Sequence, residues 1–280
     1  MITIKDRYAV LGQPIQHSKS PRIHQLFAAQ TGQLLTYEAR EVSAEQFITM
    51  VTAFFMEEGR GLNCTVPLKE LAWRYADENT ERANLSKAVN TLTLREDGAI
   101  VGDNTDGCGL VADLMVNHGI KLAGSRILIL GAGGASRGII APLFEQAPQS
   151  LVIANRTIDK AVNLATEFGD KGNVTGCGFA ALAHQHYDLI LNATSASLSD
   201  QLPPLPDGLI AEQGICYDLA YGNQPTPFVR WGLAHGAVKS LDGLGMLVEQ
   251  AAEAFFIWRG VRPDTQAVIE LLNAERSASC

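Results

Sequence analysis

One stretch decides the fold of this chain: Ser125-Arg-Ile-Leu-Ile-Leu-Gly131-Ala-Gly133-Gly134-Ala-Ser-Arg-Gly138. Its apolar run over residues 127–130 predicts a buried parallel strand, and a helical pattern follows over residues 135–144. A strand, a glycine loop and a helix in this order typically hold a dinucleotide pyrophosphate, because the backbone can approach the phosphates where the helix begins. A plain turn before a helix also explains the glycines, so the loop alone leaves both interpretations open.

The next predicted strand, residues 151–154, ends without an acidic residue at its tip. Asn155, Arg156 and Thr157 follow it, with Lys160 shortly after. NAD-binding folds usually place Asp or Glu near this strand end to bind the ribose 2′-hydroxyl. A carboxylate would repel a 2′-phosphate, whereas an arginine can hold one with its fork of donors. The tip therefore favours NADP over NAD, although Arg156 taken singly also fits a solvated surface charge.

The composition indicates a globular protein with a sizeable core. The chain has 280 residues, 46% of them hydrophobic, which suffices for one large or two ordinary domains. A net charge of -8 from scattered acids argues against a nucleic-acid surface or an acidic-membrane surface. The N-terminus lacks an apolar signal core, and no apolar run is long enough to span a bilayer. We therefore expect neither a nucleic-acid nor a membrane partner.

The cysteine pattern points to a reducing compartment. Five cysteines are present, an odd number, and they are widely spaced. Their spacing matches neither a metal site nor a disulfide framework, so we expect no metal and a cytoplasmic location.

Apolar, strand-like runs alternate with helical patterns along most of the chain, which predicts parallel sheets and the α/β class. We place the main domain boundary between residues 106 and 107. A hairpin through Asp97-Gly98 is expected between residues 88–94 and 100–102. The other expected strands are 8–12, 36–42, 62–66, 151–154, 189–192 and 215–218. The expected helices are 21–31, 44–58, 67–75, 107–117, 135–144, 246–258 and 265–274.

The segment Asn63-Cys-Thr65-Val-Pro67-Leu-Lys69 concentrates polar groups at the end of an expected strand. Pro67 suits the first position of a helix, which would put Lys69 in the first turn, facing the positive end of the helix dipole. That placement needs a compensating partner, and Asp106 in Asn104-Thr105-Asp106-Gly107 is available. A Lys–Asp pair could move protons to and from a substrate oxygen. Asp106 also fits a plain helix N-cap, and an isolated lysine fits a solvated surface.

Two further segments carry candidate binding groups. Ser18 and Ser20 flank a lysine just before a helix that begins with Pro21, so their hydroxyls could hold a small carboxylate. Ser20 as an N-cap explains one of them equally well. Near the end of the chain, Gln250 shares a mostly apolar helix face with Met246 and is the better site candidate of the two.

Taken together, these motifs resemble the shikimate dehydrogenase family over nearly the whole length, and in particular its bacterial NADP-dependent form. The resemblance is carried by Ser18-Lys-Ser20-Pro21, Asn63-Cys-Thr65-Val-Pro67-Leu-Lys69, Ala88-Val-Asn90-Thr91, Asn104-Thr105-Asp106-Gly107, Gly131-Ala-Gly133-Gly134-Ala135, Asn155-Arg156-Thr157, Asn192-Ala-Thr-Ser195 and Gly243-Leu-Gly245-Met246, in that order.

The resemblance implies reversible, NADPH-dependent reduction of 3-dehydroshikimate to shikimate, within the shikimate pathway to chorismate and the aromatic amino acids. It implies Lys69 and Asp106 as the catalytic pair. The residues implied for substrate binding are Ser18, Ser20, Asn63, Thr65, Asn90, Tyr221 and Gln250. Those implied around the cofactor are Glu81, Gly131, Ala132, Gly133, Gly134, Ala135, Asn155, Arg156, Thr157, Lys160, Thr194, Leu219, Gly243 and Met246.

The family fold has two α/β domains, an N-terminal substrate-binding domain and a Rossmann-type NADP-binding domain, with a cleft between them. By this resemblance residues 1–106 form the first domain, residues 107–246 the second, and the C-terminal helices at 247–280 return to the first. Two positions depart from the family. Lys87 stands where the family usually has Gly, and Lys160, next to Asp159, stands where close relatives often carry a second Arg.

Two alternatives stay open from the sequence. One is a quinate/shikimate dehydrogenase that uses NAD, against which the acid-free tip at residues 155–157 counts. The other is a non-catalytic NADPH-binding sensor, which would have no need of both Lys69 and Asp106. The oligomeric state stays open between a monomer and a homodimer.

Overall fold

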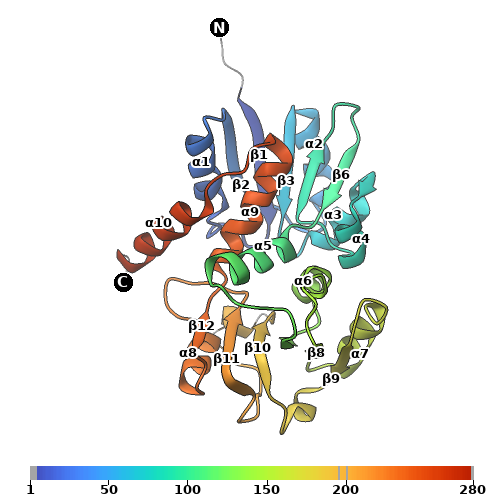
Figure 1. Cartoon of the computed structure of the whole chain (residues 1–280). Coiled ribbons are helices and arrows are strands. Elements are labelled where there is room, and N and C mark those ends of the chain that lie inside the picture. Colours follow the sequence, from blue (N-terminus) through green and yellow to red (C-terminus); the bar gives the residue numbers. More distant parts are fainter. Residues whose placement is uncertain (1–4, 195, 200, 279–280) are drawn as a thin grey trace. The chain divides into compact units, whose positions relative to one another are not determined.

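The computed structural model describes residues 5–194, 196–199 and 201–278. Two of the residues considered above, Ser195 and Cys280, lie outside these ranges. The chain folds into two compact α/β units, each with its own sheet (Figure 1). Unit 1 comprises Met1–Gly109 and Leu247–Glu270, and unit 2 comprises Leu110–Met246 and Leu271–Cys280. The predicted α/β class with two domains is confirmed.

The sheet of unit 1 has six strands in the order β2-β1-β3-β5-β6-β4. Their bounds are Asp6–Gly12 for β1, Leu35–Glu41 for β2, Gly59–Cys64 for β3, Glu78–Asn79 for β4, Thr91–Leu94 for β5 and Ile100–Asp103 for β6. Strands β1, β2 and β3 are parallel, and β5 runs antiparallel to both β3 and β6. The predicted hairpin is therefore present, with Gly98 at φ +88° in its turn. Because β6 runs in the same direction as β1 and β3, all three end at one edge of the sheet.

Helices α1 (Ser20–Thr31), α2 (Phe47–Met56), α3 (Lys69–Tyr75) and α4 (Glu81–Ser86) belong to unit 1. The chain passes from unit 1 to unit 2 within α5 (Asp106–Ala112) and returns within α9 (Leu244–Arg259). It leaves unit 1 again within α10 (Thr265–Ala278), so the residues after Glu270 group with unit 2. The sequence-based expectation had all of 247–280 in the first domain.

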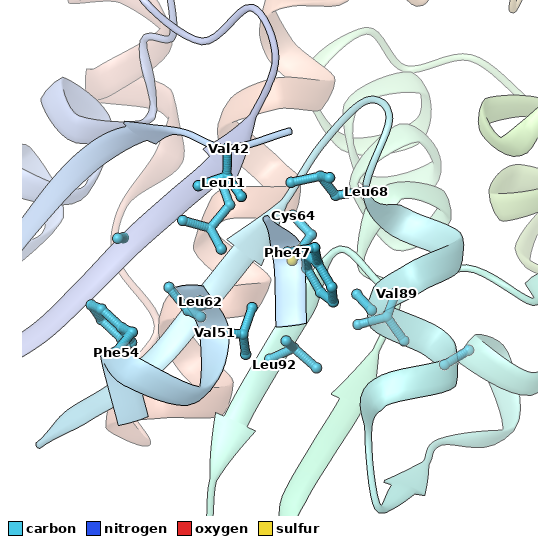
Figure 2. Packing of buried hydrophobic residues seen from close by; sticks show 13 residues of the cluster. Leu11, Val42, Phe47, Val51, Phe54, Leu62, Cys64, Leu68, Val89 and Leu92 are labelled. Carbon is cyan, nitrogen blue, oxygen red and sulfur yellow. The ribbon is translucent and has the colours of Figure 1, made fainter. Parts of the chain in front are cut away.

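The two faces of the unit 1 sheet are covered by different helices, because side chains alternate along each strand. Ala9 and Leu11 of β1 point into a cluster with Phe47, Val51 and Phe54 of α2, which Figure 2 shows from close by. On the opposite face, Tyr8 and Val10 pack with Tyr37 and Trp258. The second cluster is mostly aromatic and also includes His24, Phe27 and Phe255.

The sheet of unit 2 has six parallel strands in the order β12-β11-β10-β7-β8-β9. The bounds are Arg126–Leu130 for β7, Ser150–Ala154 for β8, Val174–Cys177 for β9, Tyr187–Asn192 for β10, Ile210–Asp218 for β11 and Lys239–Leu241 for β12. Numbered within the unit this order is 3-2-1-4-5-6, the Rossmann order, in which a dinucleotide binds where the order reverses. The reversal lies between β7 and β10, so the glycine loop after β7 stands at that point.

The helices of unit 2 are α6 (Gly134–Phe144), α7 (Ile158–Glu167) and α8 (Pro227–Ala234), with a short π-helical turn at Asp113–Asn117. Over the described ranges, every helix is too short or too polar to cross a lipid bilayer.

At two helix starts the structure differs from the positions considered for Pro67 and Ser20. Pro67 does not begin α3, because it lies in a turn that the bond from Leu68 N to Thr65 O closes at 2.7 Å, and α3 begins at Lys69. Ser20 is not the N-cap of α1, since Lys19 occupies that position and Ser20 is the first helical residue.

Candidate active site

Lys69 and Asp106 form the centre of a polar site at one edge of the unit 1 sheet. Lys69 opens α3 just after β3, and Asp106 opens α5 just after β6, so both follow strands that end at the same edge. Lys69 Nζ lies 2.5 Å from Asp106 Oδ2, and the two side chains are only 20% and 9% exposed. The carboxylate supplies the partner that a cation at a helix N-terminus requires.

Asn90 connects this pair to other elements. Its Nδ2 atom lies 2.8 Å from Thr105 Oγ1, 2.9 Å from Asp106 Oδ1 and 3.1 Å from Gln250 Oε1. Its Oδ1 atom accepts from Thr105 N at 2.9 Å. Asn90 is buried, so these bonds replace the ones that water would supply. One amide thus holds together the start of β5, the start of α5 and the middle of α9.

Asn63, the penultimate residue of β3, extends the same network. Its Nδ2 group donates to Asn90 O at 2.9 Å and to Thr91 Oγ1 at 3.1 Å, and its Oδ1 accepts from Tyr37 OH at 2.7 Å. Thr65 follows the strand and is half-buried; its backbone N–H donates to Leu11 O at 2.9 Å.

Ser18 and Ser20 lie after β1, which is parallel to β3 and ends at the same edge. Ser18 Oγ accepts from Ser20 N at 3.3 Å. Ser20 is buried and does not cap α1, and its side chain interacts with the Tyr37 phenol, whose pKa it acts to lower. The structure therefore joins five of the predicted residues directly: Asn63, Lys69, Asn90, Asp106 and Gln250. Tyr37, absent from the sequence-based prediction, links Ser20 to them.

Arg82 is a second residue that the sequence analysis did not single out. Its guanidinium makes two hydrogen bonds to Asp103, at 2.6 and 2.7 Å, and also reaches Glu253 at 3.2 Å and Cys108 Sγ at 2.8 Å. Burial acts to lower the pKa of Arg82, but its bonds to Asp103 outweigh that effect and raise the pKa. This arginine therefore connects α4 with β6, α5 and α9.

The glycine loop of unit 2 has the geometry of a phosphate cradle. Gly131 has φ +106°, and a Cβ there would lie 3.1 Å from Ala193 O, so a larger residue would be strained. Gly133 is the N-cap of α6 and has no side chain to cap the helix, while Cβ atoms at Gly133 and Gly134 would meet open space. Ser136 is fully buried and donates to Gly131 O at 2.8 Å. Ala132 in this loop is half-buried. The backbone N–H groups from Gly131 to Ala135 are suited to binding a pyrophosphate, because they lie at the start of a helix.

The tip after β8 presents basic side chains to solvent. Asn155 folds back, with Nδ2 donating to Thr157 O at 2.9 Å. Arg156 and Lys160 are exposed, and within the described part of the chain neither forms an ion pair. Asp159 stands in the first turn of α7. Free basic donors at this strand tip fit the 2′-phosphate of NADP.

A third group of predicted cofactor residues follows β10 and β11. Thr194 is held by Asn192, whose Oδ1 accepts from Thr194 Oγ1 at 2.7 Å. Position 243 requires glycine because the backbone of Leu219 lies close to it, and a Cβ there would be 2.2 Å from Leu219 O. Met246 N donates to Tyr217 OH at 3.3 Å. Tyr217 in turn donates to the buried carboxylate of Asp113 at 2.6 Å, and burial, together with that carboxylate, raises the pKa of Tyr217.

Glu81 and Tyr221 are the remaining predicted site residues. Glu81 is exposed in the first turn of α4. Tyr221 is half-buried in the loop after β11, in unit 2. A surface pocket of about 300 Å³ in unit 1, lined among others by Arg60, Thr93 and Trp258, contains none of the predicted site residues. Among the described residues, no three His, Cys, Asp or Glu side chains are grouped as a metal site would need.

Family models match three parts of the chain. The shikimate dehydrogenase substrate-binding domain matches residues 10–92, the shikimate/quinate 5-dehydrogenase model residues 113–199, and the shikimate 5-dehydrogenase C-terminal domain residues 243–272.

Similar proteins agree with these models. The chain is 64% identical to a shikimate dehydrogenase (NADP(+)) of Methylococcus capsulatus, over 98% of this chain and 99% of that protein. The crystal structure of an Ael1 enzyme from Pseudomonas putida superposes with a TM-score of 0.90 at 48% identity, covering 96% and 98% of the two chains. Shikimate 5-dehydrogenase from Thermus thermophilus, solved with NADP(H) and shikimate, gives 0.84 at 34% identity over 95% and 97%. The chain belongs to the shikimate dehydrogenase family.

Proposed function

We propose that this protein catalyses the reversible, NADPH-dependent reduction of 3-dehydroshikimate to shikimate. The observation that carries the proposal is the 2.5 Å contact between Lys69 Nζ and Asp106 Oδ2 within a half-buried polar site. An ammonium in this position can give a proton to a carbonyl oxygen, and the neutral amine that remains can take one from a hydroxyl. The family to which the chain belongs supplies the identity of the substrate.

In the reduction, bound NADPH supplies the hydride that adds to the carbonyl carbon of the substrate. Lys69 Nζ gives its proton to the oxygen, which becomes the new hydroxyl, and Lys69 is then reprotonated from solvent. In the oxidation Lys69 accepts that proton. Asp106 orients the ammonium through Oδ2 while its Oδ1 is held by Asn90, so the proton donor is fixed before the substrate arrives.

The remaining residues of unit 1 bind the substrate in this proposal. Ser18 and Ser20 hold its carboxylate, and its hydroxyls and ring lie against Asn63, Thr65, Asn90 and Gln250. Tyr221 of unit 2 is proposed to contact the same substrate. This division assigns substrate binding to unit 1 and cofactor binding to unit 2, as the family resemblance implies.

For the cofactor, we propose that residues 131–135 hold the pyrophosphate and that Arg156 and Lys160, with Asn155 and Thr157, hold the 2′-phosphate. The uncapped start of α6 and the exposed basic tip after β8 support this assignment. Residues at the nicotinamide end are Thr194, Leu219, Gly243 and Met246. Glu81 is the remaining cofactor candidate, and no contact in the structure supports it.

We further propose a cytoplasmic location, which the free thiols of Cys64, Cys108, Cys177 and Cys216 support. For the assembly we propose a monomer or a homodimer that binds neither nucleic acid nor a membrane.

The first experiment is absorbance at the NADPH band with purified protein, shikimate and NADP. Parallel reactions replace NADP by NAD, or shikimate by quinate. We expect rapid turnover only in the reaction that contains shikimate and NADP, and not in those that contain quinate or NAD. Comparable rates with NAD or quinate would instead indicate the broader quinate/shikimate specificity. NADPH binding without turnover on any of these acids would indicate a sensor and contradict the proposal.

A further inference from the structure

We infer that Tyr37 is a positioning residue that connects the two ends of the proposed substrate site; the inference rests on the proposed function. Tyr37 lies in the middle of β2, outside every motif that the sequence analysis quoted. Its hydroxyl donates to Asn63 Oδ1 at 2.7 Å, and the Ser20 side chain interacts with the same phenol and acts to lower its pKa. Ser20 is a proposed carboxylate ligand and Asn63 a proposed hydroxyl ligand, so one phenol contacts both.

The hydrogen bonds run in one direction through this phenol. Because Tyr37 gives its only proton to Asn63, it can take part in the Ser20 interaction only as the acceptor. Asn63 continues the same direction of donation, since its two Nδ2 hydrogens are donated to Asn90 O and Thr91 Oγ1. Asn90 Nδ2 in turn contacts Asp106 Oδ1. Ser20, Tyr37, Asn63, Asn90 and Asp106 thus form one continuous chain that ends at Lys69.

This order fixes how Asn63 can recognise a ligand. Both of its amide hydrogens are used within the protein, while its Oδ1, which accepts from Tyr37, has a second lone pair. Asn63 can therefore accept a hydrogen bond from a ligand but has no hydrogen left to donate. The position selects a ligand hydroxyl, a donor, over a keto or ether oxygen, which could only accept.

The surroundings of Tyr37 hold the phenol in place. Its side chain is buried, and burial raises its pKa well above the ordinary value, so the hydroxyl keeps its proton. The His24 ring stacks on it with centroids 4.0 Å apart and an angle of 6°. His24 is itself buried, and its Nε2 atom has no hydrogen-bond partner among the residues that the structure describes. A buried, stacked ring whose only hydroxyl proton is donated to Asn63 is suited to holding the Asn63 side chain in position.

Tyr8 provides a matched control. It pairs with Tyr37 across β1 and β2, lies in the same aromatic cluster, and is 3% exposed against 5% for Tyr37. Its hydroxyl is also hydrogen-bonded, accepting from Arg259 Nη1 at 3.3 Å, but that bond leads away from the site. A purely structural role for a buried tyrosine hydroxyl would make Tyr8→Phe and Tyr37→Phe behave alike.

The test compares full-length wild type with Tyr37→Phe and Tyr8→Phe. For each protein, kcat and the KM values for shikimate and for NADP are measured, together with the Tm without ligand. Tyr37→Phe leaves Asn63 Oδ1 without its buried donor and Ser20 without its acceptor, so we expect the KM for shikimate to rise about tenfold. The KM for NADP should not change. Tyr8→Phe should leave both KM values and kcat at the wild-type level.

A double-mutant cycle identifies the route of the effect. In an Asn63→Ala background the partner of Tyr37 is already absent, so Tyr37→Phe should then change the KM for shikimate much less than in the wild type. A wild-type KM for shikimate in Tyr37→Phe, or equal changes in the Tyr8 and Tyr37 variants, would overturn the inference while leaving the proposed function intact. Wild type without turnover on shikimate would overturn the proposed function, and the inference with it.

Discussion

The proposed substrate site and the proposed nucleotide site are built in opposite ways. In unit 1 the candidate side chains bind one another: Lys69 contacts Asp106, and Asn90 contacts both Asp106 and Gln250. In unit 2 the nucleotide site offers uncapped backbone N–H groups at the start of α6 and exposed basic side chains such as Arg156. The first site is therefore ordered before its ligand arrives, whereas the second relies on backbone geometry and solvated charges. Substitutions should have larger and less additive effects in the first.

The largest expected effect is that of Lys69→Ala. This change removes the group that moves the proton, so we expect kcat to fall by about 10²- to 10⁴-fold with little change in the KM for shikimate. Steady-state kinetics in both directions would measure it. Lys121→Ala, which removes an exposed lysine of unit 2, should leave kcat unchanged. A near-normal kcat in Lys69→Ala would refute the catalytic role and weaken the contrast between the two sites.

Arg156→Ala tests the other side of the comparison. An exposed arginine that binds a phosphate contributes one or two charge-assisted hydrogen bonds, so the KM for NADP should rise about 10- to 50-fold. The KM for shikimate and the kcat at saturating NADP should be preserved, because the proton-transfer pair is untouched. Activity with NAD should not fall, since NAD has no 2′-phosphate.

Lys171→Ala is the control for Arg156→Ala, because it also removes one exposed cation from unit 2. Parallel loss of NADP and NAD activity in Arg156→Ala would show that Arg156 supports the loop and does not recognise the 2′-phosphate. Equal effects of both substitutions would mean that Arg156 acts on NADP binding only through the net charge of the protein.

His24 extends the comparison from activity to stability. Burial lowers the pKa of His24 to about 3, whereas an unfolded chain protonates histidine near its ordinary value of about 6.5. Between these values the unfolded state binds more protons than the folded state, so stability is full above about 6.5 and is lost as the pH falls toward 3. At about pH 5 this group should cost about 2 kcal/mol of unfolding free energy.

Urea unfolding of wild type and His24→Phe near pH 7 and pH 5 measures this contribution. The phenylalanine keeps an aromatic ring in the cluster and cannot be protonated, so the loss of stability between the two pH values should be smaller in the variant. The exposed His17 is the control, and His17→Ala should leave the difference as it is in the wild type. Identical pH dependence in His24→Phe and wild type would mean that His24 is not held neutral.

Local patterns predicted the elements around the proposed nucleotide site better than the hydrogen bonds of the proposed substrate site. The strand, glycine loop and helix at residues 126–144 are encoded by neighbouring residues, and the structure has them as β7 and α6. Arg82 and Tyr37 look ordinary in sequence, because their roles arise only where several elements meet. For Arg82 those elements are α4, β6, α5 and α9. The pairing of Lys69 with Asp106 was predicted because a lysine in a first helical turn needs a partner, whereas the bonds to Asn90 were not predicted.

Several elements were missed for different physical reasons. Helix α7 buries Ala161, Leu164 and Ala165, a helical spacing that periodicity alone could have found. Strands β4 and β12 have only two and three residues, too few for a pattern, and exist because a neighbouring strand pairs with them. Of the two departures from the family pattern, the one at Lys87 now has a structural explanation.

Lys87 gives the smallest expected effect. It ends α4 with φ +49° and ψ +34°, the left-handed conformation in which glycine is favoured. A lysine there carries strain that its Cβ imposes, so Lys87→Gly should raise the free energy of unfolding by roughly 0.5 to 1 kcal/mol, less whatever the lysine side chain contributes. Urea unfolding at neutral pH measures the change.

Gly119 provides the mirror-image control for Lys87→Gly. It has φ +65° with open space around its missing Cβ, so Gly119→Ala should destabilise the protein by a similar amount, about 1 kcal/mol. A loss of stability in Lys87→Gly would show that contacts of the lysine outweigh its backbone strain. The kinetic constants should not change in either variant, because α4 ends outside the hydrogen-bonded site. If kcat changed in Lys87→Gly, the substrate network would extend beyond Arg82 to the end of α4, and the contrast between the two sites would be greater than the hydrogen bonds alone indicate.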